Sequence, residues 1–275
     1  MQIIKTITSF NSTLVLLNLI HWNKNMLLFK TAFISLLFIA FSVSAVTEIN
    51  YMVIQDQAQP FQNHQDKKNH TGIITDVIKR IFSGPEYEVK IHTLPFNRMI
   101  SVLEKGEMKN WITFGSPSWP GVQSANLSSL PVFNVQHSLL TSTQQNYNIN
   151  SVQDLFGKTM VLMHGFDYPG LESYIAEKKI KAIKVKSYQS AFKVVNRLKD
   201  KAGFVEMDIR IKYNLKKQQL ATQDYNLLDF SNVIADYDLH LAMSPKFNND
   251  VKRYLDSELS KLVKSGDLAE IIESY

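Results

Sequence analysis

The chain has 275 residues, and 30 Lys and Arg against 25 Asp and Glu give a formal charge of +5. With 45% hydrophobic and 11% aromatic residues, it has enough apolar side chains to bury one large core or two modest ones. A disordered chain, a collagen and a coiled coil are therefore excluded as descriptions of the whole. Because cysteine is absent, disulfides, a thiolate nucleophile, Cys-ligated metal sites and a cysteine-based lipid anchor are excluded too.

The first 45 residues contain Lys5, Lys24 and Lys30 but no acid. Without this segment the basic excess is only 2, and the remaining lysines are scattered rather than gathered in a stripe. We therefore expect no nucleic-acid partner.

Residues 31–45 form an uncharged apolar stretch that follows Lys24 and Lys30 and ends in the small residues Ser44 and Ala45. This pattern is typical of a signal peptide with cleavage after Ala45. Counted from Met26, the peptide has an ordinary length, so we interpret 1–45 as an extended N-terminus plus a signal peptide whose true start is Met26. An uncleaved anchor is the alternative, although the apolar core is short for a membrane span. We expect export to a Gram-negative periplasm.

Strand and helix patterns alternate in the first half of the remaining chain. Strand formers dominate 48–54, 87–94 and 111–114, and apolar residues recur at helical spacing over 73–81 and 95–106. This order predicts a β-α-β-α-β unit in a mostly parallel sheet.

A second unit repeats the plan after a Pro-, Gly- and Ser-rich loop at 115–131 and an extended segment at 132–140. The predicted strands are 159–163, 183–185, 203–207 and 239–243. The predicted helices are 152–155, 170–178, 187–199, 208–217, 248–265 and 267–275. Two α/β lobes follow from this pattern, and the chain crosses between them near 134–141 and 231–239.

Several local strings, in this order and spacing, resemble the extracellular solute-binding proteins of family 3. The strings are Pro60–Phe61 with 72–78, 95–98 with 103–106, 151–158, and 264–271. The resemblance covers 46–275. It implies an α/β fold of the periplasmic-binding-protein type: a two-lobed clamshell whose lobes are mostly parallel sheets flanked by helices, joined by a two-strand hinge. It places lobe 1 at 46–137 plus 236–275 and lobe 2 at 138–235.

One feature of the family is missing from this chain. Family members that bind α-amino acids usually carry, after the third strand, an Arg whose fork grips the ligand carboxylate. Between Phe114 and Ser128 this chain has no basic residue. We therefore expect simple α-amino acids to bind weakly, and Arg98 is the predicted substitute if the ligand carries a carboxylate.

Ligands of open α/β sheets bind beyond the carboxyl ends of strands, so residues that follow strands are the candidates for the cleft. Arg98 supplies a cation, Glu206 and Asp208 are placed to pair with a ligand amine, and the aromatic residues can form walls. The predicted ligand-binding residues are Phe61, Phe96, Arg98, Ser116, Trp119, His164, Tyr168, Glu206 and Asp208. For the individual side chains, packing within a lobe or a solvated surface position is the alternative. Phe61 and Glu206 lie outside the helical apolar faces, so we expect their substitution to weaken binding without disturbing the unliganded fold.

Neither a metal site nor a catalytic centre is predicted. His64 and His70 share a loop with Asp66, but their spacing matches no zinc motif, and the chain contains no Gly-x-Ser-x-Gly elbow or phosphate-binding loop. We expect no cofactor and no catalytic residue.

Three functions remain open. The first is a monomeric periplasmic protein that captures a small polar solute, amino-acid-like or another small organic molecule, for an ABC transporter. The second is a ligand sensor for a membrane signalling partner. The third is an enzyme resembling cyclohexadienyl dehydratases, which use this fold; fold alone does not decide between them.

Overall fold

The structure, a computed structural model, describes residues 46–64, 69–143 and 148–275. Both sheets lie within residues 46–275, which form a single compact unit. The predicted signal peptide, the start at Met26 and cleavage after Ala45 concern residues outside the described ones. Within the described residues, no helix is long and apolar enough to cross a membrane.

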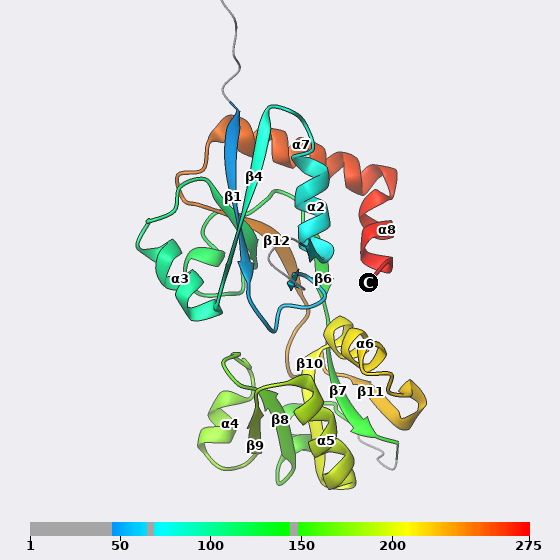
Figure 1. Cartoon of the computed structure of the whole chain (residues 1–275). Helices are drawn as coiled ribbons and strands as arrows, with labels where there is room; N and C mark the ends of the chain where they lie inside the picture. The colour runs from blue at the N-terminus through cyan, green and yellow to red at the C-terminus, as the bar shows by residue number, and fades with distance from the viewer. Residues whose placement is uncertain (1–45, 65–68, 144–147) are drawn as a thin grey trace, which may run out of the picture. The chain divides into compact units, whose positions relative to one another are not determined.

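The first sheet has five strands, and β1 lies between two parallel neighbours (Figure 1). In sheet order the strands are β4 (Tyr87–Leu94), β1 (Thr47–Ile54), β5 (Trp111–Gly115), β12 (Tyr237–Met243) and β6 (Phe133–Val135). β12 runs antiparallel to both β5 and β6.

Four helices accompany this sheet. They are α2 (Ile73–Ile81), α3 (Phe96–Glu104), α7 (Asn249–Ser265) and α8 (Asp267–Glu273). α2, α7 and α8 contact one another, and α3 lies apart from them (Figure 1). The apolar faces of α2 and α7 supply Ile74, Ile78, Leu255 and Leu259 to a core that also holds Met52, and all five side chains are fully buried.

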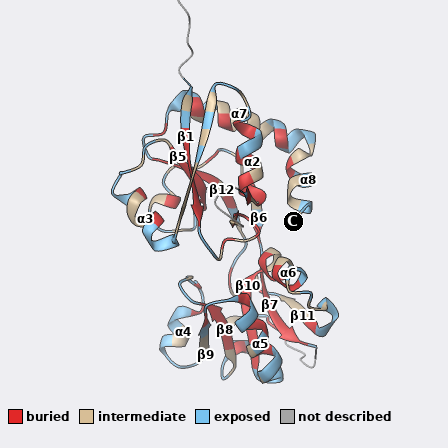
Figure 2. Cartoon of the chain, in the orientation of Figure 1, coloured by how far each residue is buried: buried red, intermediate tan, exposed pale blue. Residues whose placement is uncertain are grey.

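The second sheet also has five strands, in the order β11 (Tyr225–Asp229), β7 (His137–Ser142), β10 (Ala202–Met207), β8 (Thr159–Met163) and β9 (Lys181–Val185). Its helices are α4 (Glu172–Ala176), α5 (Tyr188–Leu198) and α6 (Asp208–Lys217). Side chains alternate along β10, so Phe204 enters one apolar cluster and Val205 enters another. Figure 2 shows the three central strands, β7, β10 and β8, buried, whereas the edge strands β9 and β11 and the outward faces of the helices are more exposed.

Short elements complete the described chain. Single turns of 3-10 helix lie at Gly121–Gln123, Val152–Leu155, Lys199–Lys201 and Thr222–Asp224. A small hairpin pairs β2 (Asn63–His64) with β3 (His70–Thr71).

The two-lobed α/β fold is confirmed, and each sheet is mixed. The strands of the predicted β-α-β units pair in parallel, as β4-β1-β5 and as β9-β8-β10. The other pairs of the two sheets are antiparallel, and each of them includes β7 or β12, the strands that follow the two passages between the sheets. β11 pairs with β7 in this way, and its short sequence YNLLD gave no strand signal.

Two connections join the sheets. β6 belongs to the first sheet and β7 to the second, with only Gln136 between them. The return passes from β11 to β12 through residues 230–236. The lobe limits of 46–137 with 236–275, and of 138–235, remain our proposal.

Candidate functional site

A buried ion pair lies where β10 gives way to α6. Glu206 is the penultimate residue of β10, and Arg210 lies in the first turn of α6. Arg210 Nη1 is 3.8 Å from Glu206 Oε1, and each residue is only 3% exposed. Two charges removed from water in this way need compensating contacts, so their surroundings decide what the pair can do.

Both oxygens of Glu206 already accept hydrogen bonds. Oε1 accepts from the backbone N–H of Met207 at 2.9 Å, and Oε2 accepts from the hydroxyl of Tyr188 at 3.2 Å. Burial raises the pKa of the Glu206 carboxyl, against the opposing effects of Arg210 and of these hydrogen bonds. Burial also raises the pKa of Tyr188, so its hydroxyl stays protonated and acts as the donor.

Arg210 lies between two aromatic rings. Its Cζ is 5.5 Å from the ring centroid of Phe61, which follows β1, and 5.2 Å from that of Phe166, which follows β8. Both are cation–π distances, and desolvation strengthens such contacts. Arg210 Nε is buried and has no hydrogen-bond partner among the described residues. The guanidinium therefore contacts residues of both lobes, and its Nε–H donor has no acceptor.

An aromatic chain extends from Phe61 along the first lobe. The Phe61 ring lies 5.5 Å from Phe133 and 5.9 Å from Phe114. Trp119 lies 5.8 Å from Phe114 and 6.2 Å from Tyr237. Trp119 and Tyr237 are half-buried, and Phe61, at the other end of this chain of rings, gives Arg210 an apolar boundary.

His137 adds a second unused polar atom. Its Nδ1 is buried without a hydrogen-bond partner in the described part of the chain, and its ring lies 5.8 Å from Tyr237. Burial, with the positive charge of Arg210 as a second cause, lowers the pKa of His137 from 6.5 to about 4. The imidazole is therefore neutral at neutral pH. We call this set the Arg210 cluster: Phe61, Trp119, His137, Phe166, Tyr188, Glu206, Arg210 and Tyr237.

Two further hydrogen bonds connect the two lobes. Gln57 Nε2 donates to the carbonyl of Lys186 at 3.2 Å, and the Tyr213 hydroxyl donates to Asn63 Oδ1 at 3.4 Å. Gln57 and Asn63 flank Phe61 in sequence, so the segment after β1 faces the second lobe at several points.

The structure brings three of the residues predicted from sequence into the cluster, namely Phe61, Trp119 and Glu206. Tyr168 and Asp208 lie close by, but their polar atoms are engaged. The Tyr168 hydroxyl accepts from the backbone N–H of Met163 at 2.7 Å. Asp208 accepts from Ser138 Oγ at 3.1 Å and pairs with Lys212 Nζ at 2.6 Å.

The other four predicted residues lie elsewhere. Ser116 is fully buried and shapes the loop after β5, since its carbonyl accepts from the N–H of Trp119 at 3.1 Å. His164 is exposed just after β8, while Phe96 and Arg98 are exposed on α3. Whether any of the nine predicted residues touches a ligand stays a prediction.

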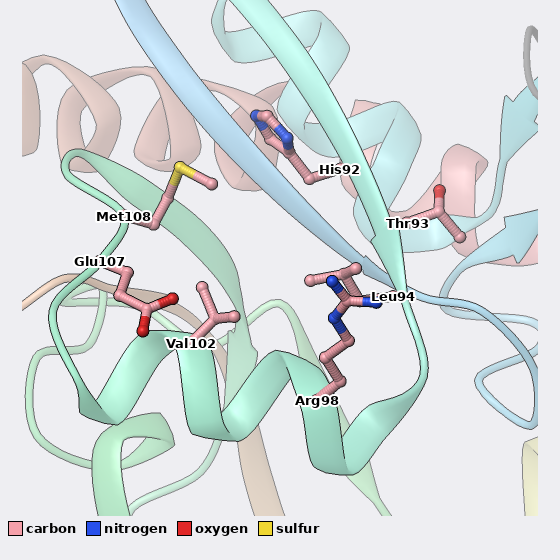
Figure 3. A pocket seen from close by; sticks show the side chains of 7 residues that line it. All are labelled: His92, Thr93, Leu94, Arg98, Val102, Glu107 and Met108. Atoms are coloured by element: carbon pink, nitrogen blue, oxygen red, sulfur yellow. The ribbon is translucent and has the colours of Figure 1, made fainter.

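Arg98 lines a separate surface pocket of about 440 Å³ between β4 and α3 (Figure 3). His92 projects from the strand and Glu107 lies beyond the end of the helix, so the polar side chains are spread around the pocket rather than gathered. The His92 ring already bonds to Asn50 Oδ1 at 2.7 Å. This pocket shares no residue with the Arg210 cluster.

Sequence reasoning did not single out Arg210, His137, Phe166, Tyr188 or Tyr237. A signal for Arg210 was present, because it follows the end of the predicted strand 203–207. Phe166 follows the predicted strand 159–163 in the same way. No such signal marks His137, Tyr188 or Tyr237, because their proximity depends on how β7, α5 and β12 are arranged. No group of three or more His, Asp or Glu among the described residues could hold a metal ion.

Comparison with known proteins assigns the chain to a family. The model of the bacterial extracellular solute-binding proteins, family 3, matches residues 51–275. The chain belongs to this family. Its members are ligand-binding proteins with this two-lobed fold. A search of curated proteins found no match.

Solved structures of the same fold include proteins with different roles. A mutant of ArgBP from T. maritima is 19% identical with a TM-score of 0.59, covering 83% of this chain and 94% of that one. The substrate-binding protein of an amino acid ABC transporter is 17% identical with a TM-score of 0.60, covering 83% and 99%. A histidine kinase sensor domain is 15% identical with a TM-score of 0.62, covering 84% and 96%.

Proposed function

We propose that this protein captures a small polar solute at the Arg210 cluster and passes it to a partner in the inner membrane. The observation that carries the proposal is the buried Glu206–Arg210 pair of the second lobe packed on Phe61 of the first, in a family 3 chain. A solute bound there would contact both lobes at once. Such contacts favour the arrangement in which the lobes come together around it.

The proposed role is binding without chemistry. A binding protein returns its solute unchanged, whereas a dehydratase of the same fold would convert it. Incubating the protein with each solute that binds, followed by mass spectrometry of the recovered solute, separates these outcomes. We expect the solute to be recovered intact.

We propose an ABC transporter as the partner and the periplasm as the location. The likeness to the binding protein of an amino acid ABC transporter supports this choice, and the likeness to a histidine kinase sensor domain keeps sensing as the second candidate. Permease and ATPase genes beside the coding gene favour transport, and a neighbouring signalling gene favours sensing.

A thermal-shift screen of the purified protein tests the proposal. The panel comprises amino acids, small peptides, polyamines and organic acids. A ligand present at 100 times its Kd stabilises the folded state by about 2.7 kcal/mol, which raises the Tm measurably. We expect at least one compound to do so, and a panel without any such compound would contradict the proposal.

Matched variants show where a stabilising compound binds. Trp119→Leu removes a half-buried ring of the cluster, whereas Phe96→Leu removes an exposed ring on α3. We expect the first to weaken binding and the second to leave it unchanged.

A further inference from the structure

Two buried nitrogen atoms of the Arg210 cluster have no partner in the described part of the chain: Arg210 Nε and His137 Nδ1. They are held near each other by backbone pairing. His137 lies opposite Met207 in the β7–β10 ladder, and the N–H of Asp208 donates to the carbonyl of Gln136 at 2.9 Å. The residues that carry the two unpaired nitrogens are therefore held side by side by the backbone.

An unused donor on a buried guanidinium is unfavourable, because the group loses its water without gaining an acceptor. Arginine carries five N–H donors in a planar fork, which fits the two oxygens of a carboxylate. A bound carboxylate would supply the missing acceptor. The position of Arg210 between two rings, with its stem fixed on α6, leaves the fork little freedom before such a ligand arrives.

Glu206 is not the hydrogen-bond acceptor that Arg210 lacks. Its nearest oxygen stands 3.8 Å from Arg210 Nη1, beyond hydrogen-bond distance, and both its oxygens accept from Met207 and Tyr188. Glu206 therefore compensates the charge of Arg210 without accepting a hydrogen bond from its Nε, and the Tyr188 hydroxyl, which also interacts with Arg210, leaves Nε without a partner as well.

The neighbouring groups indicate what else the ligand carries. Phe61 lies against Arg210, Tyr237 lies beside His137, and Trp119 packs on Tyr237, so aromatic rings surround the two unpaired nitrogens. Such walls suit an apolar or cyclic body. The loop from Phe114 to Ser128 adds no second cation that would call for a dianion.

We propose that Arg210, with His137 as a second hydrogen-bonding group, binds the carboxylate of a small monocarboxylate whose apolar or cyclic body packs on Phe61 and Trp119. This assignment rests on the proposed function, and it gives the anion-binding role to the second lobe instead of to Arg98.

The test uses acids paired with their neutral amides, measured by calorimetry on the purified protein. The pairs are benzoate with benzamide, phenylacetate with phenylacetamide, and cyclohexanecarboxylate with its amide. We expect at least one acid to bind and its amide to bind at least tenfold more weakly, the effect of losing one charge-assisted hydrogen bond.

Variants assign the contact to a residue. Arg210→Lys keeps a cation beside Glu206 but removes the fork and Nε, so we expect at least about a tenfold loss of acid binding. Arg210→Gln should abolish it, and circular dichroism of both variants reports whether they fold. Arg98→Ala is the matched control and should bind the acid as the unmodified protein does.

The other outcomes overturn the assignment. Acid binding that survives Arg210→Lys, or that is lost in Arg98→Ala, moves the carboxylate to another residue. If no acid binds while a neutral or cationic solute from the thermal-shift screen does, the ligand class is wrong and the proposed function stands. If no solute of any kind binds, both proposals fail.

Discussion

At the scale of single residues, His137 links the site to the pH dependence of stability. The folded state binds a proton at His137 less readily than the unfolded state does, because its pKa falls from 6.5 to about 4. The unfolded chain therefore holds more protons in this window, and stability rises with pH between about 4 and 6.5. At about 1.4 kcal/mol per pKa unit, the contribution reaches roughly 3 kcal/mol above pH 6.5 and is lost as the pH falls to 4.

We predict that His137→Gln removes this contribution. In urea titrations between pH 4 and 7, the free energy of unfolding of the unmodified protein should rise with pH more steeply than that of the variant. For Glu206→Gln the opposite trend is expected. Above pH 4.5 the free energy of unfolding of the unmodified protein should fall with pH relative to that of this variant, because burial raises the pKa of the Glu206 carboxyl in the folded state. A difference for His137→Gln that is constant with pH would contradict the account.

Phe61 is more important to the fold than its sequence context suggests. From the sequence we expect its substitution to leave the unliganded fold intact, but the ring is fully buried against Phe114 and Phe133 in the core of the first lobe. The inference that Phe61 lies outside the core was wrong, because Phe61 lies in an irregular segment after β1, where periodicity carries no information about burial.

We predict that Phe61→Ala lowers the free energy of unfolding by about 3 to 5 kcal/mol, the usual cost of emptying a buried phenylalanine site. Phe96, which is 37% exposed, is the control, and its replacement by alanine should change stability by no more than about 0.5 kcal/mol. Equal effects of the two substitutions, measured by urea unfolding, would show that Phe61 is not packed as described.

At the scale of elements, Gly115 fixes the loop that carries Trp119. A Cβ placed on this last residue of β5 would lie 1.8 Å from the carbonyl oxygen of Gln123, so only glycine allows the two backbone segments to meet. Gln123 Nε2 also donates to the carbonyl of Phe114 at 2.8 Å, which holds the same two segments together.

We predict that Gly115→Ala destabilises the protein by at least about 2 kcal/mol and changes its tryptophan fluorescence, because one backbone segment must shift. Gly106→Ala is the control, since no atom lies within 4 Å of its added Cβ and only its positive φ opposes the change. A Gly115→Ala protein with unaltered Tm and emission would refute the close approach.

The elements differ in how well the sequence predicted them. α6 at Asp208–Lys217 and α7 at Asn249–Ser265 follow regular helical signals, and α7 has Asn248 as an N-cap bonded to the N–H of Asp250. β11 carries no comparable pattern, and it is a strand because it pairs with β7 along five residues. Local propensity therefore predicted the β-α-β units, whereas the antiparallel strands depend on contacts between distant segments.

The site residues likewise differ in how well the sequence predicted them. The rule that ligands bind beyond strand ends led to Phe61, Trp119 and Glu206, because each follows or ends a predicted strand. Arg98 satisfies the same rule, yet α3 directs it to a different pocket. Which strand ends converge is decided by sheet order, and that order was not available from the sequence.

At the scale of the whole molecule, we predict a processed, exported protein. Mass spectrometry of material from the periplasmic fraction should find Val46 as the N-terminal residue, because the apolar stretch ends at the small residues before it. An intact Met1 or Met26 on a membrane-bound product would contradict this prediction.

Binding of a solute at the junction of the two lobes is the central claim, and a crystal structure of the protein with its best-binding solute tests it most directly. The account predicts electron density for the solute against Arg210 and His137, with its apolar part on Phe61 and Trp119. Density in the pocket of His92, Arg98 and Glu107, with the Arg210 cluster unchanged, would contradict it.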